Sequence, residues 1–201
     1  MYQQALYRAK DMTMKENSIV VLRFGQTPGI INREETDIVQ TPMECFSRAV
    51  LGKTQFIVVI LSGRNISARS LVFELCRCLK KNPLTKEIPV IVLMDSIHRE
   101  ILVKFHESGV TLFKNYKSGS CIDLNQIKDL IGGRDQAVNL RGLLKKICPA
   151  LNYIKIDDRY ELIVCGAYMN RMALGGIRLH EVCETHNHLN CEYFVSPRMA
   201  L

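Results

Sequence analysis

Cysteines are the residues of this chain with the greatest chemical potential, and half of them gather near its end. Eight cysteines occur in 201 residues, and four fall in the last third: Cys148, Cys165, Cys183 and Cys191. A cysteine thiolate is a strong ligand for zinc and for iron. Four thiolates converging from separate elements would close a small module that otherwise lacks a hydrophobic core, at a size where metals commonly supplement the hydrophobic effect. These four residues are therefore predicted to bind zinc or an iron–sulfur cluster.

The spacing of the four cysteines does not select the metal. Gaps of 16, 17 and 7 residues separate them, whereas zinc fingers and ribbons usually carry cysteines in close pairs. The opening Cys148-Pro149 and the closing stretch from Cys183 to Phe194 resemble small cysteine-rich modules found beside signalling domains in anaerobic bacteria. That resemblance implies either an iron–sulfur cluster or zinc, and the choice between them stays open.

Two other interpretations of the same region remain. In one, the four thiols are buried as small hydrophobic groups, while His186 and His188 lie in a surface loop. In the other, histidines share a mixed site with the cysteines, because imidazole is also a common zinc ligand. His180 lies just before this pair of histidines.

The other four cysteines are expected to be structural. Cys45, Cys76 and Cys78 lie in predicted helices and are expected to fill the core, while Cys121 falls in a loop. Residues two apart on a helix point to different faces, so Cys76 and Cys78 cannot chelate one ion together. Cysteine catalysis would need a histidine partner, and nothing in the sequence ties His98 or His106 to a thiol. The chain is therefore expected not to be an enzyme.

The elements that must position these residues are organised around one apolar run, Phe56 to Leu61. Six apolar residues that end abruptly in a turn predict a strand buried on both faces, in the middle of a parallel sheet. In an open α/β sheet the ligand lies beyond the carboxyl ends of the strands. Ser62, Gly63 and Arg64 therefore mark the place where function is expected.

Strands and helices alternate over the first part of the chain. The patterns predict strands at 18–24, 37–40, 56–61, 89–94 and 110–114, and helices at 41–52, 67–81 and 95–109. Thr41 with Pro42 is expected to cap the first of these helices, and Asp95 or Ser96 the third. On the helix at 67–81, the apolar face is expected to contain Leu71, Val72, Leu75, Cys78 and Leu79. The alternation predicts the α/β class with a doubly wound parallel sheet.

The composition changes after about residue 120. Short helices are predicted at 124–131 and 135–148, and a β-hairpin from strands at 153–157 and 160–166. The expected organisation is an N-terminal helix over 1–17, an α/β domain over 18–120, a helical linker over 121–147 and a Cys/His-rich α+β module over 148–201.

One stretch of the sequence resembles a known protein family. The stretch Ile88-Pro89-Val90-Ile91-Val92-Leu93, then a helix, then Glu107-Ser108-Gly109-Val110 and a strand, resembles bacterial response-regulator receiver domains over residues 18–116. The resemblance implies a flavodoxin-like fold. It also implies an aspartate that accepts a phosphoryl group at the end of the third strand, and acids after the first strand that hold magnesium. A hydroxyl residue would end the fourth strand and a lysine the fifth.

The chain departs from that pattern at each acidic position. Arg23 stands near the end of the first strand and Ser62 at the end of the third, so no aspartate occurs at either place. Asp95 follows the fourth strand where a hydroxyl residue is expected, and Lys114 or Lys117 could supply the lysine. The loop between the first two strands is too short for the usual first helix. A degenerate receiver without magnesium or phosphotransfer is therefore expected, with Asp95 as a substitute acceptor the alternative.

Bulk properties narrow the function further. The net charge of +7 is spread along the chain among acids, whereas nucleic-acid footprints are usually concentrated, so nucleic-acid binding is a lesser alternative. No apolar stretch reaches membrane-span length, and eight cysteines without a signal sequence favour a reducing cytoplasm. The preferred hypothesis is a non-catalytic signal-transduction protein, of the kind found in two-component systems, that binds a protein partner through residues 97–131. An iron–sulfur electron carrier or enzyme subunit is the main alternative.

Overall fold

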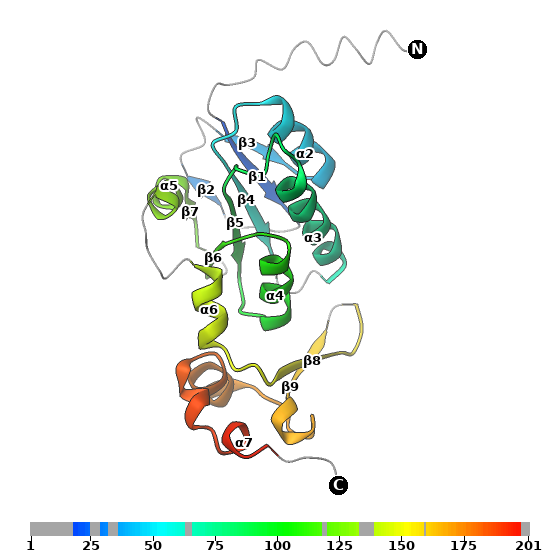
Figure 1. Ribbon diagram of the computed structural model, residues 1–201, viewed down its shortest axis with the longest axis vertical. Helices are drawn as coiled ribbons and strands as arrows, with labels where there is room; N and C mark the ends of the chain where they lie inside the picture. The colour runs from blue at the N-terminus through cyan, green and yellow to red at the C-terminus, as the bar shows by residue number, and fades with distance from the viewer. Residues whose placement is uncertain are drawn as a thin grey trace.

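The computed structural model describes residues 18–24, 29–31, 36–62, 66–117, 120–132, 139–158 and 160–197. They form an α/β part built on a parallel sheet and a smaller C-terminal part that contains a hairpin (Figure 1). The predicted N-terminal helix over 1–17 lies outside the described residues, as do Gly63 and Arg64.

Five parallel strands form the main sheet. They are β1 (Ile19–Arg23), β3 (Thr36–Val39), β4 (Phe56–Leu61), β5 (Val90–Met94) and β6 (Leu112–Asn115), in the order β3-β1-β4-β5-β6. Counted within this sheet alone the order is 2-1-3-4-5, which is consistent with a flavodoxin-like fold. All six residues of β4 are buried, and the strand occupies the middle of the sheet. The prediction of an α/β fold around this strand is confirmed.

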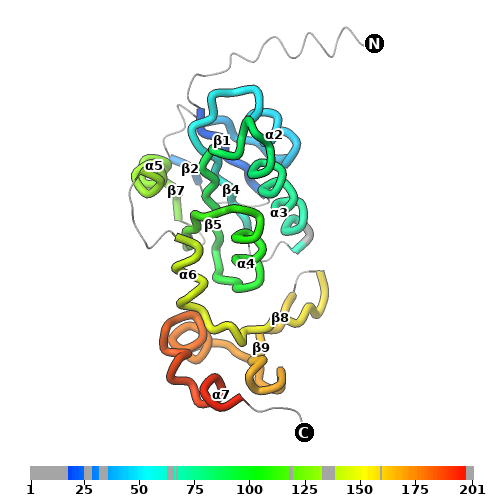
Figure 2. The backbone as a smooth tube through the Cα atoms, in the orientation of Figure 1, coloured from blue at the N-terminus to red at the C-terminus, as the bar shows by residue number. Residues whose placement is uncertain are grey.

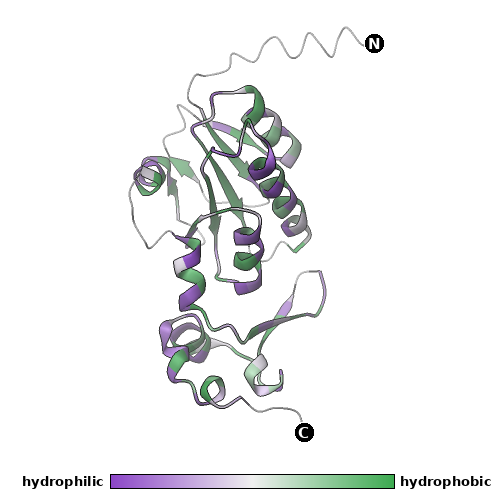
Figure 3. Ribbon diagram, viewed as in Figure 1, coloured by the Kyte–Doolittle hydropathy of each residue, from purple (hydrophilic) through white to green (hydrophobic). Residues whose placement is uncertain are grey.

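The two faces of the sheet bury alternate residues because side chains alternate along a strand. One face contributes Val20, Ile57, Val59, Val90 and Val92 to a cluster that also holds residues of α2 (Pro42–Leu51), α3 (Ile66–Lys81) and α4 (Arg99–Glu107). The other face contributes Val21, Val58, Ile60, Ile91 and Leu93 to a second cluster with α5 (Leu124–Gly132). In Figure 3 the central strands of the main sheet are coloured mostly as hydrophobic, as burial on both faces requires.

Local signals explain where two helices begin. At α2 the Thr41 side chain accepts a hydrogen bond from the Glu44 backbone N–H at 3.2 Å, and Pro42 opens the helix, as predicted. The prediction for α4 is wrong: neither Asp95 nor Ser96 caps this helix. His98 is the N-cap, and its Nδ1 accepts from the Ile101 backbone N–H at 3.4 Å.

Two side chains of α3 do not lie where the pattern placed them. Leu71 and Cys78 are exposed, whereas Cys76 is fully buried. The buried stripe instead follows Val72, Leu75, Cys76 and Leu79, a set spaced by three and four residues that fits one helix face. The core-filling prediction is therefore confirmed for Cys45 and Cys76 and wrong for Cys78.

A second, two-stranded sheet lies where only loop was expected. Strand β2 (Ile30–Ile31) pairs in parallel with β7 (Ile122–Asp123), far away in the chain. Ile30 and Ile122 are buried in the same cluster as α5. The two strands and α5 therefore pack on this face of the main sheet, where the connection between β1 and β3 is too short to form a helix.

The C-terminal part lies beyond the carboxyl ends of the main strands (Figures 1 and 2). Helix α6 (Leu140–Lys146) leads into it, and β8 (Leu151–Lys155) pairs antiparallel with β9 (Glu161–Cys165), which confirms the predicted hairpin. Short helical segments follow: η2 (Gly166–Tyr168), η3 (Arg178–Cys183), η4 (His186–Asn190) and α7 (Glu192–Val195). The first residues of the predicted helix over 135–148 lie outside the described residues.

The C-terminal part does have a core, and it shares that core with the α/β part. The cluster under α3 and α4 continues through Leu140 and Ile147 to Leu151, Leu174 and Leu179. The expectation that this segment relies on a metal for want of apolar contacts therefore needs correction. Among the described helices, none is both long and apolar enough to cross a membrane.

Candidate functional site

The four predicted cysteines come from four different elements of the C-terminal part. Cys148 follows α6, Cys165 ends β9, Cys183 ends η3, and Cys191 immediately precedes α7. The backbone N–H of Cys148 donates to the Cys183 carbonyl at 2.7 Å, which joins the helix end to η3. Hairpin pairing sets Cys165 opposite Leu151, only three residues after Cys148.

A close backbone approach helps to set this arrangement. The Gly166 N–H donates to the Ala150 carbonyl at 2.7 Å. A Cβ at Gly166 would lie 2.8 Å from Asn152 Nδ2 and 3.0 Å from the Ala150 oxygen, so only glycine fits without displacement. The turn after Cys148 and the turn after Cys165 are held together in this way.

The charges of the four cysteines influence one another. Burial raises the pKa of Cys183, the charges of nearby Cys148, Cys165 and Cys191 add to the rise, and the pKa reaches about 11. Burial likewise raises the pKa of Cys148, and Cys165 and Cys191 add to that rise, against the lowering effect of a backbone hydrogen bond. Like charges disfavour one another at short range, so each thiolate would destabilise the next unless a cation lay between them.

The cysteine side chains, as they are oriented, do not form a coordination shell. Over the described residues, no group of three or more His, Cys, Asp and Glu side chains is placed so that it could hold a metal ion. Cys148, Cys165 and Cys183 are buried and Cys191 is half-buried. Metal binding by the four cysteines stays a prediction, and so does the buried-thiol alternative.

The histidines of this region differ from one another. His186 is exposed, as expected for a loop residue. His188 is buried, contrary to that expectation, and its Nδ1 donates to the Thr185 carbonyl at 2.6 Å. This bond leaves the lone pair on Nε2, the tautomer found when an imidazole binds metal through that atom. His180 pairs with Glu184 at 2.8 Å instead.

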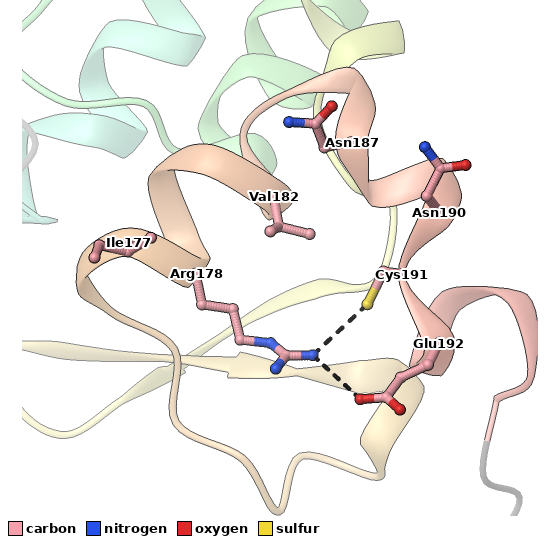
Figure 4. A pocket seen from close by; sticks show the side chains of 7 residues that line it. All are labelled: Ile177, Arg178, Val182, Asn187, Asn190, Cys191 and Glu192. Atoms are coloured by element: carbon pink, nitrogen blue, oxygen red, sulfur yellow. Dashed lines mark hydrogen bonds and ion pairs between the residues drawn. The ribbon is translucent and has the colours of Figure 1, made fainter.

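One open pocket of about 600 Å³ borders Cys191 (Figure 4). Arg178 projects into it from η3, and its Nη2 lies 3.9 Å from Cys191 Sγ and 3.9 Å from Glu192 Oε1. The guanidinium also lies 5.0 Å from the centre of the Tyr193 ring, within range of a cation–π contact. The pocket is therefore lined by a cation and a thiol side by side.

A buried ionic bridge attaches the hairpin to the α/β part. Glu161 of β9 accepts from Arg69 Nη1 at 2.7 Å and from His98 Nε2 at 3.1 Å. His98 can donate through Nε2 because its Nδ1 already accepts from Ile101. Arg69 lies in the first turn of α3 and His98 caps α4, so one carboxylate joins the N-terminal ends of two helices.

Tyr153 on the same face of the hairpin strengthens this attachment. Its ring stacks on His98 with centroids 3.6 Å apart, and its hydroxyl accepts from the Arg99 backbone N–H at 2.9 Å. Sequence reasoning missed Arg69, Tyr153 and Glu161, since no local pattern marks a contact that spans 92 residues.

Acid is expected to weaken this attachment. Burial, together with the positive charge of Arg69, lowers the pKa of His98 to about 4 from its ordinary 6.5. The unfolded chain then binds the proton more readily than the folded one. Stability should fall by about 3 kcal/mol as the pH drops from 6.5 to 4, which denaturant titrations at a series of pH values would measure.

A variant identifies the group behind that pH dependence. His98→Asn keeps an oxygen that can cap α4 but cannot titrate in this range. Its free energy of unfolding should change much less between pH 6.5 and pH 4. A slope equal to that of the original protein would assign the effect to other groups.

The carboxyl edge of the sheet carries few groups for phosphoryl chemistry. The Ser62 hydroxyl donates to Asp95 Oδ2 at 2.9 Å, which links the ends of β4 and β5. Arg23 ends β1, and no carboxylate occupies the described ends of β1 and β4. Lys114 lies within β6 and is half-buried, while Lys117 is exposed beyond it.

Comparisons with known proteins assign no family. No protein-family model matches the chain, and no curated protein matches it. Its class is therefore defined by the fold alone, as an α/β protein with a flavodoxin-like sheet order and a C-terminal part that carries a hairpin.

Proposed function

We propose that the chain is a non-catalytic signal-transduction protein in which a receiver-like interaction domain is joined to a four-cysteine metal-binding module. The observation that carries this proposal is that four thiols, from four elements of the C-terminal part, lie near one another. Three of them are buried. Buried thiols become good ligands once a cation displaces their protons.

The missing coordination shell does not oppose this proposal. A cysteine sulfur moves by rotation about a single bond, between staggered positions, while the backbone stays in place. Without a cation, protonated thiols attract one another only weakly, so no force orients their sulfur atoms toward a common centre. A metal ion at their centre would replace the mutual repulsion of thiolates with attraction to one positive charge.

The α/β part supports an interaction role. A divalent cation needs carboxylate or similar oxygen ligands, and Arg23 ends the strand after which receivers carry their acids. Ser62 takes the place of the acceptor aspartate, and its hydroxyl is engaged with Asp95. Such a domain would act by binding a protein partner, and residues 97–131 are the surface that the receiver resemblance implies.

The first test is metal analysis of protein purified without oxygen. Stoichiometric zinc and no colour would support a structural or sensing module. Stoichiometric iron with visible absorption from sulfur-to-iron charge transfer would support an iron–sulfur cluster and favour the electron-carrier alternative. Absence of any metal after growth in zinc and iron would remove the metal-binding half of the proposal and return the four thiols to the core.

Phosphoryl donors are expected to leave the chain unmodified. After incubation with acetyl phosphate and magnesium, intact-mass measurement should show less than about one-tenth of the molecules with an added phosphoryl group, because no acceptor aspartate ends β4. Asp95→Asn is the matched variant. A stable phosphoryl adduct that this variant loses would identify Asp95 as a substitute acceptor and contradict the proposed loss of phosphotransfer.

A further inference from the structure

Cys191 differs from the other three cysteines of the module in its surroundings. Cys148, Cys165 and Cys183 are buried, whereas Cys191 is half-buried and faces the open pocket beside η3 (Figure 4). A dissolved reagent therefore reaches this sulfur without any opening of the fold. Two of the buried thiols, those of Cys148 and Cys183, lie near enough to Cys191 for its charge to raise their pKa values.

Arg178 makes this sulfur chemically distinctive. Its guanidinium donates toward Cys191 Sγ over 3.9 Å and is held there by Glu192 on one side and the Tyr193 ring on the other. Reactive cysteines characteristically combine partial exposure with a neighbouring arginine, lysine or protonated histidine. The pocket offers this combination, with Ile177 and Val182 as apolar walls.

We propose that Cys191 is the oxidation site of the module, at which hydrogen peroxide entering the pocket reacts first and releases the bound metal. This inference rests on the proposed function for the metal, but the order in which the thiols react does not require one. The pocket is the entry route, Cys191 the attacking thiol, and a buried neighbour the resolving thiol.

The chemistry balances in two steps. The Cys191 thiolate attacks one peroxide oxygen, the O–O bond breaks, and a sulfenic acid and hydroxide form. The thiol of Cys148 or Cys183 then attacks the sulfenic sulfur, which forms a disulfide and releases water. Peroxide is reduced, two thiols are oxidised, and the cation that they shared loses two of its ligands.

The test compares individual cysteines in one protein. Exposed Cys78 and Cys121 are first replaced by serine, so that Cys191 is the one accessible thiol among the described residues. Metal-loaded and metal-free samples then receive hydrogen peroxide, and mass spectrometry follows each cysteine while an indicator dye follows metal release. Cys191 should be oxidised roughly tenfold faster than the three buried thiols, and metal should leave at the rate of Cys191 loss.

The outcomes separate the two proposals. Bound metal together with equal oxidation of all four thiols, or faster oxidation of a buried one, would overturn the oxidation site and leave metal binding intact. Protein that never binds metal, yet is oxidised first at Cys191, would support the oxidation site and remove the metal-binding proposal. Metal release before any loss of Cys191 would also overturn the inference.

A charge-matched pair of variants tests the part played by Arg178. Arg178→Met removes the cation beside the sulfur, and Arg171→Met removes an exposed cation elsewhere in the C-terminal part. In metal-free protein, Arg178→Met should slow the reaction of Cys191 with the dianionic disulfide DTNB about threefold or more, and with neutral iodoacetamide less. Equal slowing by both variants would show that net charge, and not the pocket, controls the rate.

Discussion

Glu161→Gln is expected to lower the free energy of unfolding by about 3 kcal/mol, because it leaves a buried arginine without its counter-charge. The side chains of Arg69 and Glu161 are 10% and 17% exposed, so water can replace little of the lost interaction. The glutamine amide oxygen can still accept one hydrogen bond. The loss of stability should therefore lie near the lower end of the range for breaking a buried ion pair. Denaturant titration at neutral pH measures the change.

The elements in which Glu161→Gln speeds hydrogen exchange distinguish the Arg69–Glu161–His98 bridge from an ordinary surface contact. Hydrogen exchange should accelerate first in the hairpin of β8 and β9 and at the starts of α3 and α4, which the carboxylate joins to it. Glu181→Gln removes an exposed acid of the same part and should cost less than about 0.5 kcal/mol. Equal losses for the two variants would mean that the Arg69–Glu161–His98 bridge contributes little to docking.

Cys183→Ser is expected to abolish stoichiometric metal binding and to loosen the C-terminal part. Cys183 is one of the four proposed ligands, and the charges of the three others raise its pKa, so its removal breaks the proposed site. Loss of a ligand also removes the stability that the bound metal adds to the folded state. Metal analysis and hydrogen exchange over residues 148–197 measure the two effects separately.

Cys76→Ser is the matched control for this prediction. Cys76 is another fully buried thiol, but it lies in α3, away from the C-terminal part. It should cost about 1–3 kcal/mol through burial of a hydroxyl, and it should leave the metal content unchanged. If Cys183→Ser keeps its metal, or changes exchange no more than Cys76→Ser does, the four thiols are core residues.

The α/β part could be predicted largely from local patterns. The run from Phe56 to Leu61 and the run from Val90 to Met94 are strands buried on both faces, and their apolar continuity is visible without any structure. Thr41 with Pro42 marks the start of α2 in the same way, since a cap acts on its own neighbours. Where local signals competed, prediction failed: His98 caps α4 although Asp95 and Ser96 are commoner capping types.

The candidate site, too, could be predicted only in part. The four cysteines stand out in the sequence because thiols are rare and chemically distinct, but their gaps of 16, 17 and 7 residues say nothing about which of them meet. Their approach depends on the Cys148–Cys183 hydrogen bond and on the close contact at Gly166. Both are made between segments that are distant in the chain.

The sequence by itself determined the alternation of strands and helices, the central strand and the hairpin, because periodicity and capping act within a few residues. Only the tertiary structure decided that Glu161 joins Arg69 and His98, that Cys191 borders an open pocket, and that the C-terminal part shares its core with the sheet. The physical reason is distance along the chain. Burial and ion pairing depend on which segments the whole fold brings together, and no local pattern encodes that choice.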